Sequence, residues 1–321
     1  MKAIRMCHHT KELIDNEMKI NGKIHSIFNR VLNIITPDDK LISIVSSQVP
    51  IPPRGIVLEL PSQNSFHSLN FNPGMKVTIN KQYLEAADGK FQLNLSEALV
   101  WDSRPDSTFD KAQDVDFKKK LELFREALVS EGNFNGIAPI FAKLEKQLTN
   151  RSNNDEILYN HYCYFIERRM LKLLDSIINN NTEGARKAAK EIVGFGPGLT
   201  PSADDFLTGL IIAMVYCTIY LAENVEKIYK IAESLVEGVE FRTTKISAEM
   251  LTFASNGEVS ENVKQLMISL FSVSKPEDLN NPLKSVINNG ETSGTDLAAG
   301  IYIGCLLSNE LWRGRGAFNE Y

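Results

Sequence analysis

The chain has 321 residues, of which 43% are hydrophobic and 23% are charged. This composition is typical of a folded soluble protein with one large domain or two ordinary ones. Its formal net charge of -5 disfavours a nucleic acid or an anionic membrane surface as a partner. The four cysteines are far apart and form no C-x-x-C pair, a usage typical of the reducing cytoplasm. The spacing of histidines and cysteines indicates no metal site.

The N-terminal third of the sequence alternates between short apolar segments and turn signals. We expect strands at residues 25–35, 41–46, 55–60, 76–79, 91–95 and 98–101. Clusters of proline, aspartate, asparagine and glycine separate these segments. Short strands at such spacing predict a small antiparallel β barrel or sandwich, which we assign to residues 1–105.

From residue 106 onwards the apolar residues recur at three- and four-residue spacings, which predicts helices. We expect them at residues 117–129, 136–148, 160–179, 183–193, 201–221, 225–239, 245–255, 259–271, 276–286 and 296–309. A mainly helical second domain over residues 106–321 makes the fold class α+β. The apolar run 206–221 is shorter than the roughly 20 residues that a bilayer requires, so we expect a buried central helix.

A glycine-rich loop precedes this central helix and carries Gly194, Gly196 and Gly198. Glycine permits left-handed backbone angles and the close approach of a ligand. We expect Thr200 to cap the helix and Pro201 to be its first residue. The N–H groups between Gly196 and Ser202, including those of Leu199 and Thr200, would then form an anion site at the helix N-terminus. The alternative is a purely structural helix cap.

Asp204 and Asp205 follow in the first turn of the same helix. Carboxylates at this position stabilise a helix through its dipole, which is the structural explanation. A catalytic role requires that they accept hydrogen bonds from a substrate NH₂ group or share a Mg²⁺ with a bound anion.

A second loop precedes the last helix and contains Thr292, Ser293, Gly294, Thr295 and Asp296. Ser293 and Asp296 have the S-x-x-D spacing of a capping box. The functional alternative is a second substrate-binding helix N-terminus, close to the first loop, so that the two loops share one site. If the loops open on opposite faces, they are two separate caps.

Arg242 lies directly before Thr243 and Thr244, at the start of another predicted helix. An arginine there can hold a carboxylate or phosphate with paired N–H bonds. A surface arginine beside an ordinary helix cap is the alternative.

The glycine-rich segment G-F-G-P-G-L-T-P-S-A-D-D-F-L-T-G resembles the signature of the bacterial AllH-like family. Segments S-I-F-N-R, R-T-T-K-I-S and E-T-S-G-T-D support the resemblance in the family's order. It implies carbamoyl transfer between carbamoyl phosphate and oxamate, within a multi-subunit complex of anaerobic allantoin and purine breakdown. By this resemblance alone, Asn29 and Arg30 join the substrate-binding set.

Three functions remain open at this point. In the first, the chain is an enzyme or enzyme subunit, with Asp204, Asp205 and Arg242 as catalytic residues and both loops binding substrate. In the second, it is a non-catalytic subunit that binds an anionic metabolite, and in the third a Mg²⁺-dependent phosphoryl-transfer enzyme. We predict no obligatory cofactor, with Mg²⁺ the one candidate, and leave assembly into a homo-oligomer open.

Overall fold

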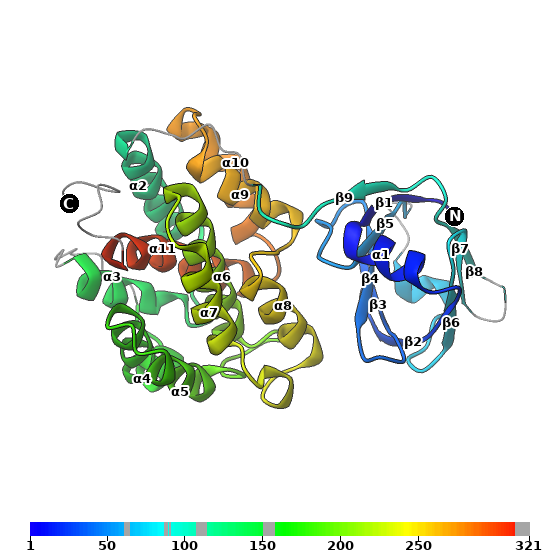
Figure 1. Cartoon of the computed structure of the whole chain (residues 1–321), viewed down its shortest axis with the longest axis horizontal. Coiled ribbons are helices and arrows are strands. Elements are labelled where there is room, and N and C mark those ends of the chain that lie inside the picture. The colour runs from blue at the N-terminus through cyan, green and yellow to red at the C-terminus, as the bar shows by residue number, and fades with distance from the viewer. Residues whose placement is uncertain (61–64, 87–88, 90, 107–113, 150–157, 312–321) are drawn as a thin grey trace. The chain divides into compact units, whose positions relative to one another are not determined.

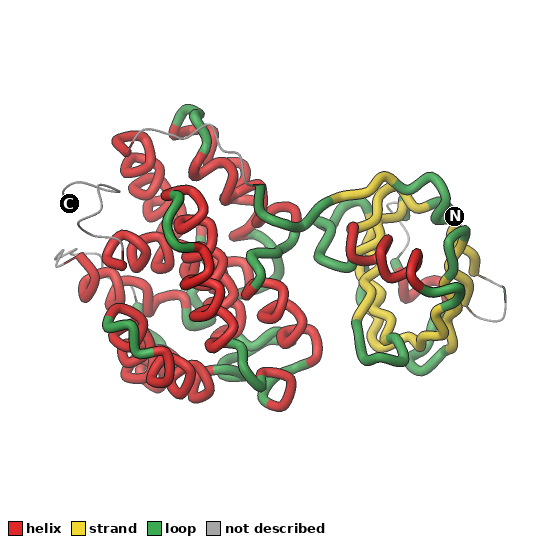
Figure 2. Tube along the Cα trace, viewed as in Figure 1, coloured by secondary structure: helices red, strands yellow, loops and turns green. Residues whose placement is uncertain are grey.

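The computed structural model describes residues 1–60, 65–86, 89, 91–106, 114–149 and 158–311. The chain divides into two compact units, Met1–Ser103 and Arg104–Tyr321. The first unit is rich in strands, whereas the elements named in the described part of the second are helices joined by loops (Figure 2). The predicted α+β class is therefore confirmed.

The first unit is one curled sheet. Its strands are β1 (Ala3–Cys7), β2 (Ile20–Ile27), β3 (Val31–Ile35), β4 (Leu41–Ser46), β5 (Gly55–Leu58), β6 (Lys76–Ile79), β7 (Tyr83–Ala86), β8 (Phe91–Asn94) and β9 (Leu99–Trp101). Their order is β8-β7-β6-β2-β3-β4-β5-β1-β9, antiparallel except for the pairs β4–β5 and β1–β9. Lys2, the residue before β1, forms an isolated β-bridge with Asn94 in β8, the strand at the opposite end of this order. The sheet therefore curls round on itself.

Sequence-based prediction missed the strands β1 and β7, helix α1 (His8–Asn16) and a short 3₁₀ helix in this unit. The strands are short, and the N-cap residue of α1, Cys7, makes no side-chain capping bond. The single strand expected at residues 25–35 is wrong: β2 and β3 are an antiparallel pair that turns at Asn29 and Arg30. A short 3₁₀ helix, η1 (Phe66–Leu69), precedes β6.

The second unit is a bundle of helices (Figure 1). They are α2 (Asp114–Glu131), α3 (Phe141–Thr149), α4 (His161–Ile178), α5 (Thr182–Ile192), α6 (Ser202–Leu221), α7 (Val225–Leu235), α8 (Lys245–Ser255), α9 (Glu261–Phe271), α10 (Asn280–Ile287) and α11 (Ser293–Leu311), with 3₁₀ turns η2 (Ala138–Ile140), η3 (Val239–Phe241) and η4 (Pro276–Leu279). Every helix predicted after residue 106 is present, with ends shifted by a few residues. Periodicity is reliable here because most of these helices are amphipathic.

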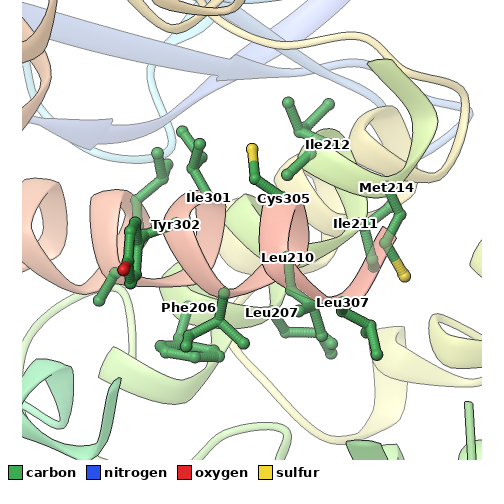
Figure 3. Packing of buried hydrophobic residues seen from close by; sticks show 14 of the residues in the cluster. Phe206, Leu207, Leu210, Ile211, Ile212, Met214, Ile301, Tyr302, Cys305 and Leu307 are labelled. Atoms are coloured by element: carbon green, nitrogen blue, oxygen red, sulfur yellow. The ribbon is translucent and has the colours of Figure 1, made fainter. Parts of the chain in front are cut away.

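Helices α6 and α11 form the centre of the helical unit. Both are buried along nearly their whole length, so the expected central helix is confirmed. Among the described helices, α6 alone has the length and composition to cross a membrane, with a mean hydropathy of 1.5. Because 89% of that window is buried, its apolarity is explained by packing within the protein. Figure 3 shows side chains of both helices, among them Leu210 and Ile301, within one apolar cluster.

Glycines allow the two helix backbones to touch. A Cβ atom at Gly209 would lie 2.8 Å from the backbone nitrogen of Ile301, and one at Gly300 would overlap the carbonyl oxygen of Phe206. Gly304 in turn faces Leu210. The contacts advance in the same direction along both helices, so α6 and α11 run parallel. Their N-termini therefore lie at the same end of the bundle.

Candidate functional site

The two loops that precede α6 and α11 meet. The Oγ1 atom of Thr200 and the Oγ atom of Ser293 are 2.7 Å apart and share a hydrogen bond. The parallel packing of the helices causes this meeting, because it brings two helix starts that are far apart in sequence to one place. The prediction that the two loops adjoin is confirmed, and the alternative of loops on opposite faces is wrong.

The start of α6 differs from the prediction. Pro201 is the N-cap residue, in an extended conformation, and Ser202 is the first helical residue. The expected capping role of Thr200 is wrong, because its hydroxyl donates to a carboxylate instead of accepting an N–H bond. That carboxylate is Asp205, whose Oδ2 atom lies 3.0 Å from Thr200 Oγ1.

Asp204 ties the glycine loop to the segment before α8. Its Oδ1 atom accepts the N–H of Gly194 at 2.7 Å, and its Oδ2 atom accepts the hydroxyl of Thr243. Only 1% of Asp204 is exposed, and this burial raises the pKa of its carboxyl, while the Thr243 hydroxyl and the Gly194 N–H oppose the rise. Gly194 has φ +81°, and a Cβ there would overlap the carbonyl oxygen of Arg242. Asp204 thus holds the loop in place.

Asp205 is equally buried, with 1% exposure. Burial raises its pKa well above the ordinary value, and the nearby charge of Asp296 adds to the rise. The hydroxyls of Ser293 and Thr200 oppose it. Both hydroxyl-bearing residues are only half-buried, so they lie between the buried carboxyl and the surface.

Asp296 is the third carboxyl at the junction and is fully buried. Its Oδ1 atom accepts the N–H of Ala138 in η2 at 2.7 Å. Its Oδ2 atom is buried and has no hydrogen-bond partner in the described part of the chain. Burial raises the pKa of Asp296 to about 7, and the nearby Ser202 hydroxyl and the Ala138 N–H limit the rise. The predicted capping box is wrong, because Ser293 is already helical and Asp296 bonds to a different element.

The rest of the second loop is engaged in the fold. Thr295 Oγ1 accepts the N–H of Asn133 at 2.9 Å, and the Gly294 N–H donates to Asn289. Thr292 is buried, and its carbonyl accepts the N–H of Asp296. Of the five residues predicted in this loop, Ser293 is therefore the one that offers a half-buried hydroxyl beside the first loop.

Arg242 and Thr244 lie at the edge of this arrangement. The exposed guanidinium of Arg242 donates through Nη1 to the carbonyl of Lys190 at 3.1 Å. Thr244 is the N-cap of α8, and its side chain accepts the N–H of Ser247. It thus has the ordinary capping role that was the alternative to substrate binding. Thr243, between them, is the residue that reaches a site carboxyl.

The first loop retains free hydrogen-bond donors. The N–H groups of Gly196, Gly198 and Leu199 have no acceptor among the residues that the structure describes. Gly198 and Leu199 are exposed, and Gly196 is half-buried. Such N–H groups next to a helix N-terminus are well suited to bind an anion.

Asn29 and Arg30 belong to the first unit, at the turn between β2 and β3. The carbonyl of Asn29 accepts the N–H of Phe66, and that of Arg30 accepts the N–H of Ser46. They are not among the residues that α6 and α11 bring together, so their substrate role remains a prediction from resemblance.

Sequence reasoning missed the segment between α2 and η2. It supplies the Ala138 N–H to Asp296, and Gly136 leaves room for that carboxyl. The turn-rich run N-F-N-G at residues 133–136 was the available signal, although nothing in it indicated a contact with the second loop.

Two family models match the chain on either side of the unit boundary. The model described as oxamate carbamoyltransferase subunit AllH matches residues 192–305, which include both loops and all three carboxyls. The AllH family N-terminal domain matches residues 2–100. The chain belongs to the AllH family. The family's description implies further subunits of a carbamoyltransferase complex. No solved structure matches the chain.

Proposed function

We propose that this AllH-family chain binds the substrates of carbamoyl transfer between carbamoyl phosphate and oxamate, which yields oxalurate and phosphate. The observation that carries the proposal is the 2.7 Å contact between Thr200 and Ser293, because it joins two helix N-termini. Each N-terminus is equivalent to about half a positive charge, so the junction attracts anions. Both substrates are anions.

The free N–H groups of Gly196, Gly198 and Leu199 suit the phosphate group. The Ser293 end of the junction is then available to the oxamate carboxylate. Arg242 uses Nη1 for Lys190, and its other guanidinium N–H groups have no partner in the described chain. It can therefore stabilise charge on the departing phosphate.

The reaction needs no covalent intermediate on the protein. The oxamate amide nitrogen attacks the carbamoyl carbon, a C–N bond forms, and the C–O bond to phosphate breaks. Positioning of two anions and stabilisation of the developing charge supply the catalysis. We propose no obligatory metal: both oxygens of Asp204 already accept hydrogen bonds, so Mg²⁺ binding there would have to displace Gly194 or Thr243.

The direct test follows the incorporation of labelled inorganic phosphate into carbamoyl phosphate in the presence of oxalurate, which is the reverse of the proposed reaction. The chain is assayed alone and then with its partner subunits, with and without EDTA. We expect EDTA-insensitive exchange at least in the complex. Absence of exchange with folded protein in both cases would refute the proposal. Cytoplasmic location and a role in anaerobic allantoin and purine breakdown belong to the same proposal.

A second function is favoured by one observation, the burial of all three carboxyls to 1% exposure or less. A non-catalytic subunit that binds an anionic metabolite needs no exposed acid or base. Asp205→Asn separates the two functions. Loss of rate with little change in substrate affinity supports catalysis, whereas altered affinity without a specific rate defect supports the binding subunit.

A further inference from the structure

Asp205 is near the substrate junction but cannot touch a ligand in this conformation. Its side chain is 1% exposed, and its Oδ2 atom is covered by the Thr200 hydroxyl at 3.0 Å. Any proton that passes between Asp205 and a bound substrate must therefore pass through a neighbouring group.

The hydroxyls of Thr200 and Ser293 provide such a connection. A hydroxyl has one proton to donate. Since Thr200 donates to Asp205, Ser293 is the donor in the 2.7 Å bond to Thr200. The Ser293 oxygen, at the half-buried outer end, is then left as an acceptor for a substrate N–H. The three groups form a continuous donor–acceptor chain from the surface to the carboxyl.

We propose that Ser293 and Thr200 relay a proton between the substrate's amide nitrogen and Asp205, which stores it during carbamoyl transfer. As the C–N bond forms, the amide proton moves to Ser293, the Ser293 proton moves to Thr200, and the Thr200 proton moves to Asp205. As the C–O bond to phosphate breaks, the proton returns along the same hydroxyls to the phosphate oxygen. Each hydroxyl ends the cycle as it began.

The surroundings of Asp205 suit a proton store. Asp296 from α11 and Asp204 from the same helix are the titratable groups that act on it, and both disfavour its negative charge. Burial acts in the same direction. The ionised carboxyl therefore accepts a proton readily, and in either direction of the reaction the relay starts from this ionised form. The relay rests on the proposed function.

The test replaces the Thr200 hydroxyl by a methyl group of the same shape, in Thr200→Val, and restores a hydroxyl in Thr200→Ser. Activity of the complex is measured across pH, with the solvent isotope effect on kcat. General acid–base groups contribute about 100-fold or more, so we expect kcat of Thr200→Val to fall by at least that factor with little change in KM. We expect Thr200→Ser to recover most of it. The wild-type solvent isotope effect on kcat should disappear in the valine variant. The step in the wild-type pH profile that reports the ionisation of Asp205 should disappear as well.

Thr218→Val is the matched control, because Thr218 lies on α6, the helix that carries Asp205, and its hydroxyl donates to the carbonyl of Met214. It should leave kcat and the pH profile unchanged. If Thr200→Val is folded and keeps the wild-type kcat and pH profile, the relay is refuted while the proposed function stands. If the valine variant does not fold, Ser293→Ala, on the other side of the relay, decides by the same readouts. A wild-type complex without exchange refutes both proposals together.

Discussion

The carboxyl of Asp296 lies directly over the backbone of Gly136. A Cβ atom at position 136 would be 2.6 Å from Asp296 Oδ1, closer than real Cβ atoms come to an oxygen. The glycine therefore makes room for a buried acid that arrives from a helix starting far away in the sequence. This relationship fixes the segment before α3 to the start of α11.

Gly136→Ala should destabilise the helical unit because the added methyl group overlaps this carboxyl. Overpacking of this kind costs typically about 1–3 kcal/mol of unfolding free energy. Urea unfolding measures the loss. In a chain that already carries Asp296→Ala, adding Gly136→Ala should cost less unfolding free energy than it costs in the wild type, since the clashing carboxyl is gone. Strict additivity of the two losses would contradict the clash.

Stability should fall as pH rises from about 4 to 7. In the folded chain the pKa of Asp296 is raised to about 7 from an ordinary 3.8, so the folded state holds a proton that the unfolded state has lost. The free energy of unfolding then decreases with pH, by up to about 1.4 kcal/mol per pH unit for each such group. The raised pKa values of Asp204 and Asp205 act in the same direction.

Asp296→Asn tests this contribution, because the amide stays neutral at all pH values. Unfolding curves at pH 5 and pH 7 should show a smaller pH dependence than in the wild type. Asp175→Asn, at an exposed position on α4, is the control and should leave the dependence unchanged. An equal slope in wild type and Asp296→Asn would show that Asp296 titrates normally.

Gly198→Val should abolish phosphate binding and leave the helical core folded. Gly198 has φ +102°, which a β-branched residue adopts only with strain, and its N–H is a proposed anion donor. Phosphate at about 100 times its Kd should stabilise the wild type by about 2.7 kcal/mol, visible as a rise in Tm. Leu199→Val, next to it at a residue 72% exposed, should keep the rise. A rise in the Tm of Gly198→Val on addition of phosphate would show that the anion binds elsewhere.

Thr243→Val should loosen the glycine loop by removing the hydroxyl that Asp204 accepts. A buried carboxyl that loses a donor costs about 1–3 kcal/mol. Thermal unfolding should show the loss, and Thr243→Ser should recover it. Phosphate affinity should fall as well, because Asp204 also holds the Gly194 N–H. Unchanged stability in the valine variant would mean that Thr243 and Asp204 act independently.

Sequence patterns predicted the helical unit well because its helices obey a local periodicity. They also predicted that the two loops lie close together, since two polar, glycine-bearing starts precede two strongly apolar helices. They missed β1, β7 and α1, which are short and depend on pairing with distant segments.

The chemistry within the site was less predictable, because each hydroxyl and carboxyl had several local partners to choose from. Thr200 and Ser293 have the types and spacings of helix caps, yet they hydrogen-bond to each other. Asp296 bonds to Ala138, which no local rule selects. Long-range packing of α6 on α11 decides these partners, and one sequence alone does not reveal it.

The pairing of α6 with α11 also affects how the protein is made. A ribosome releases α6 well before α11, because the whole of residues 222–292 must be synthesised between them. During that interval the most apolar of the described helices lacks the helix that covers it, and such distant contacts must form before the domain can complete its folding. We therefore expect nascent chains that stop before Ser293 to be held by chaperones or degraded, and to become protease-resistant once α11 has been added.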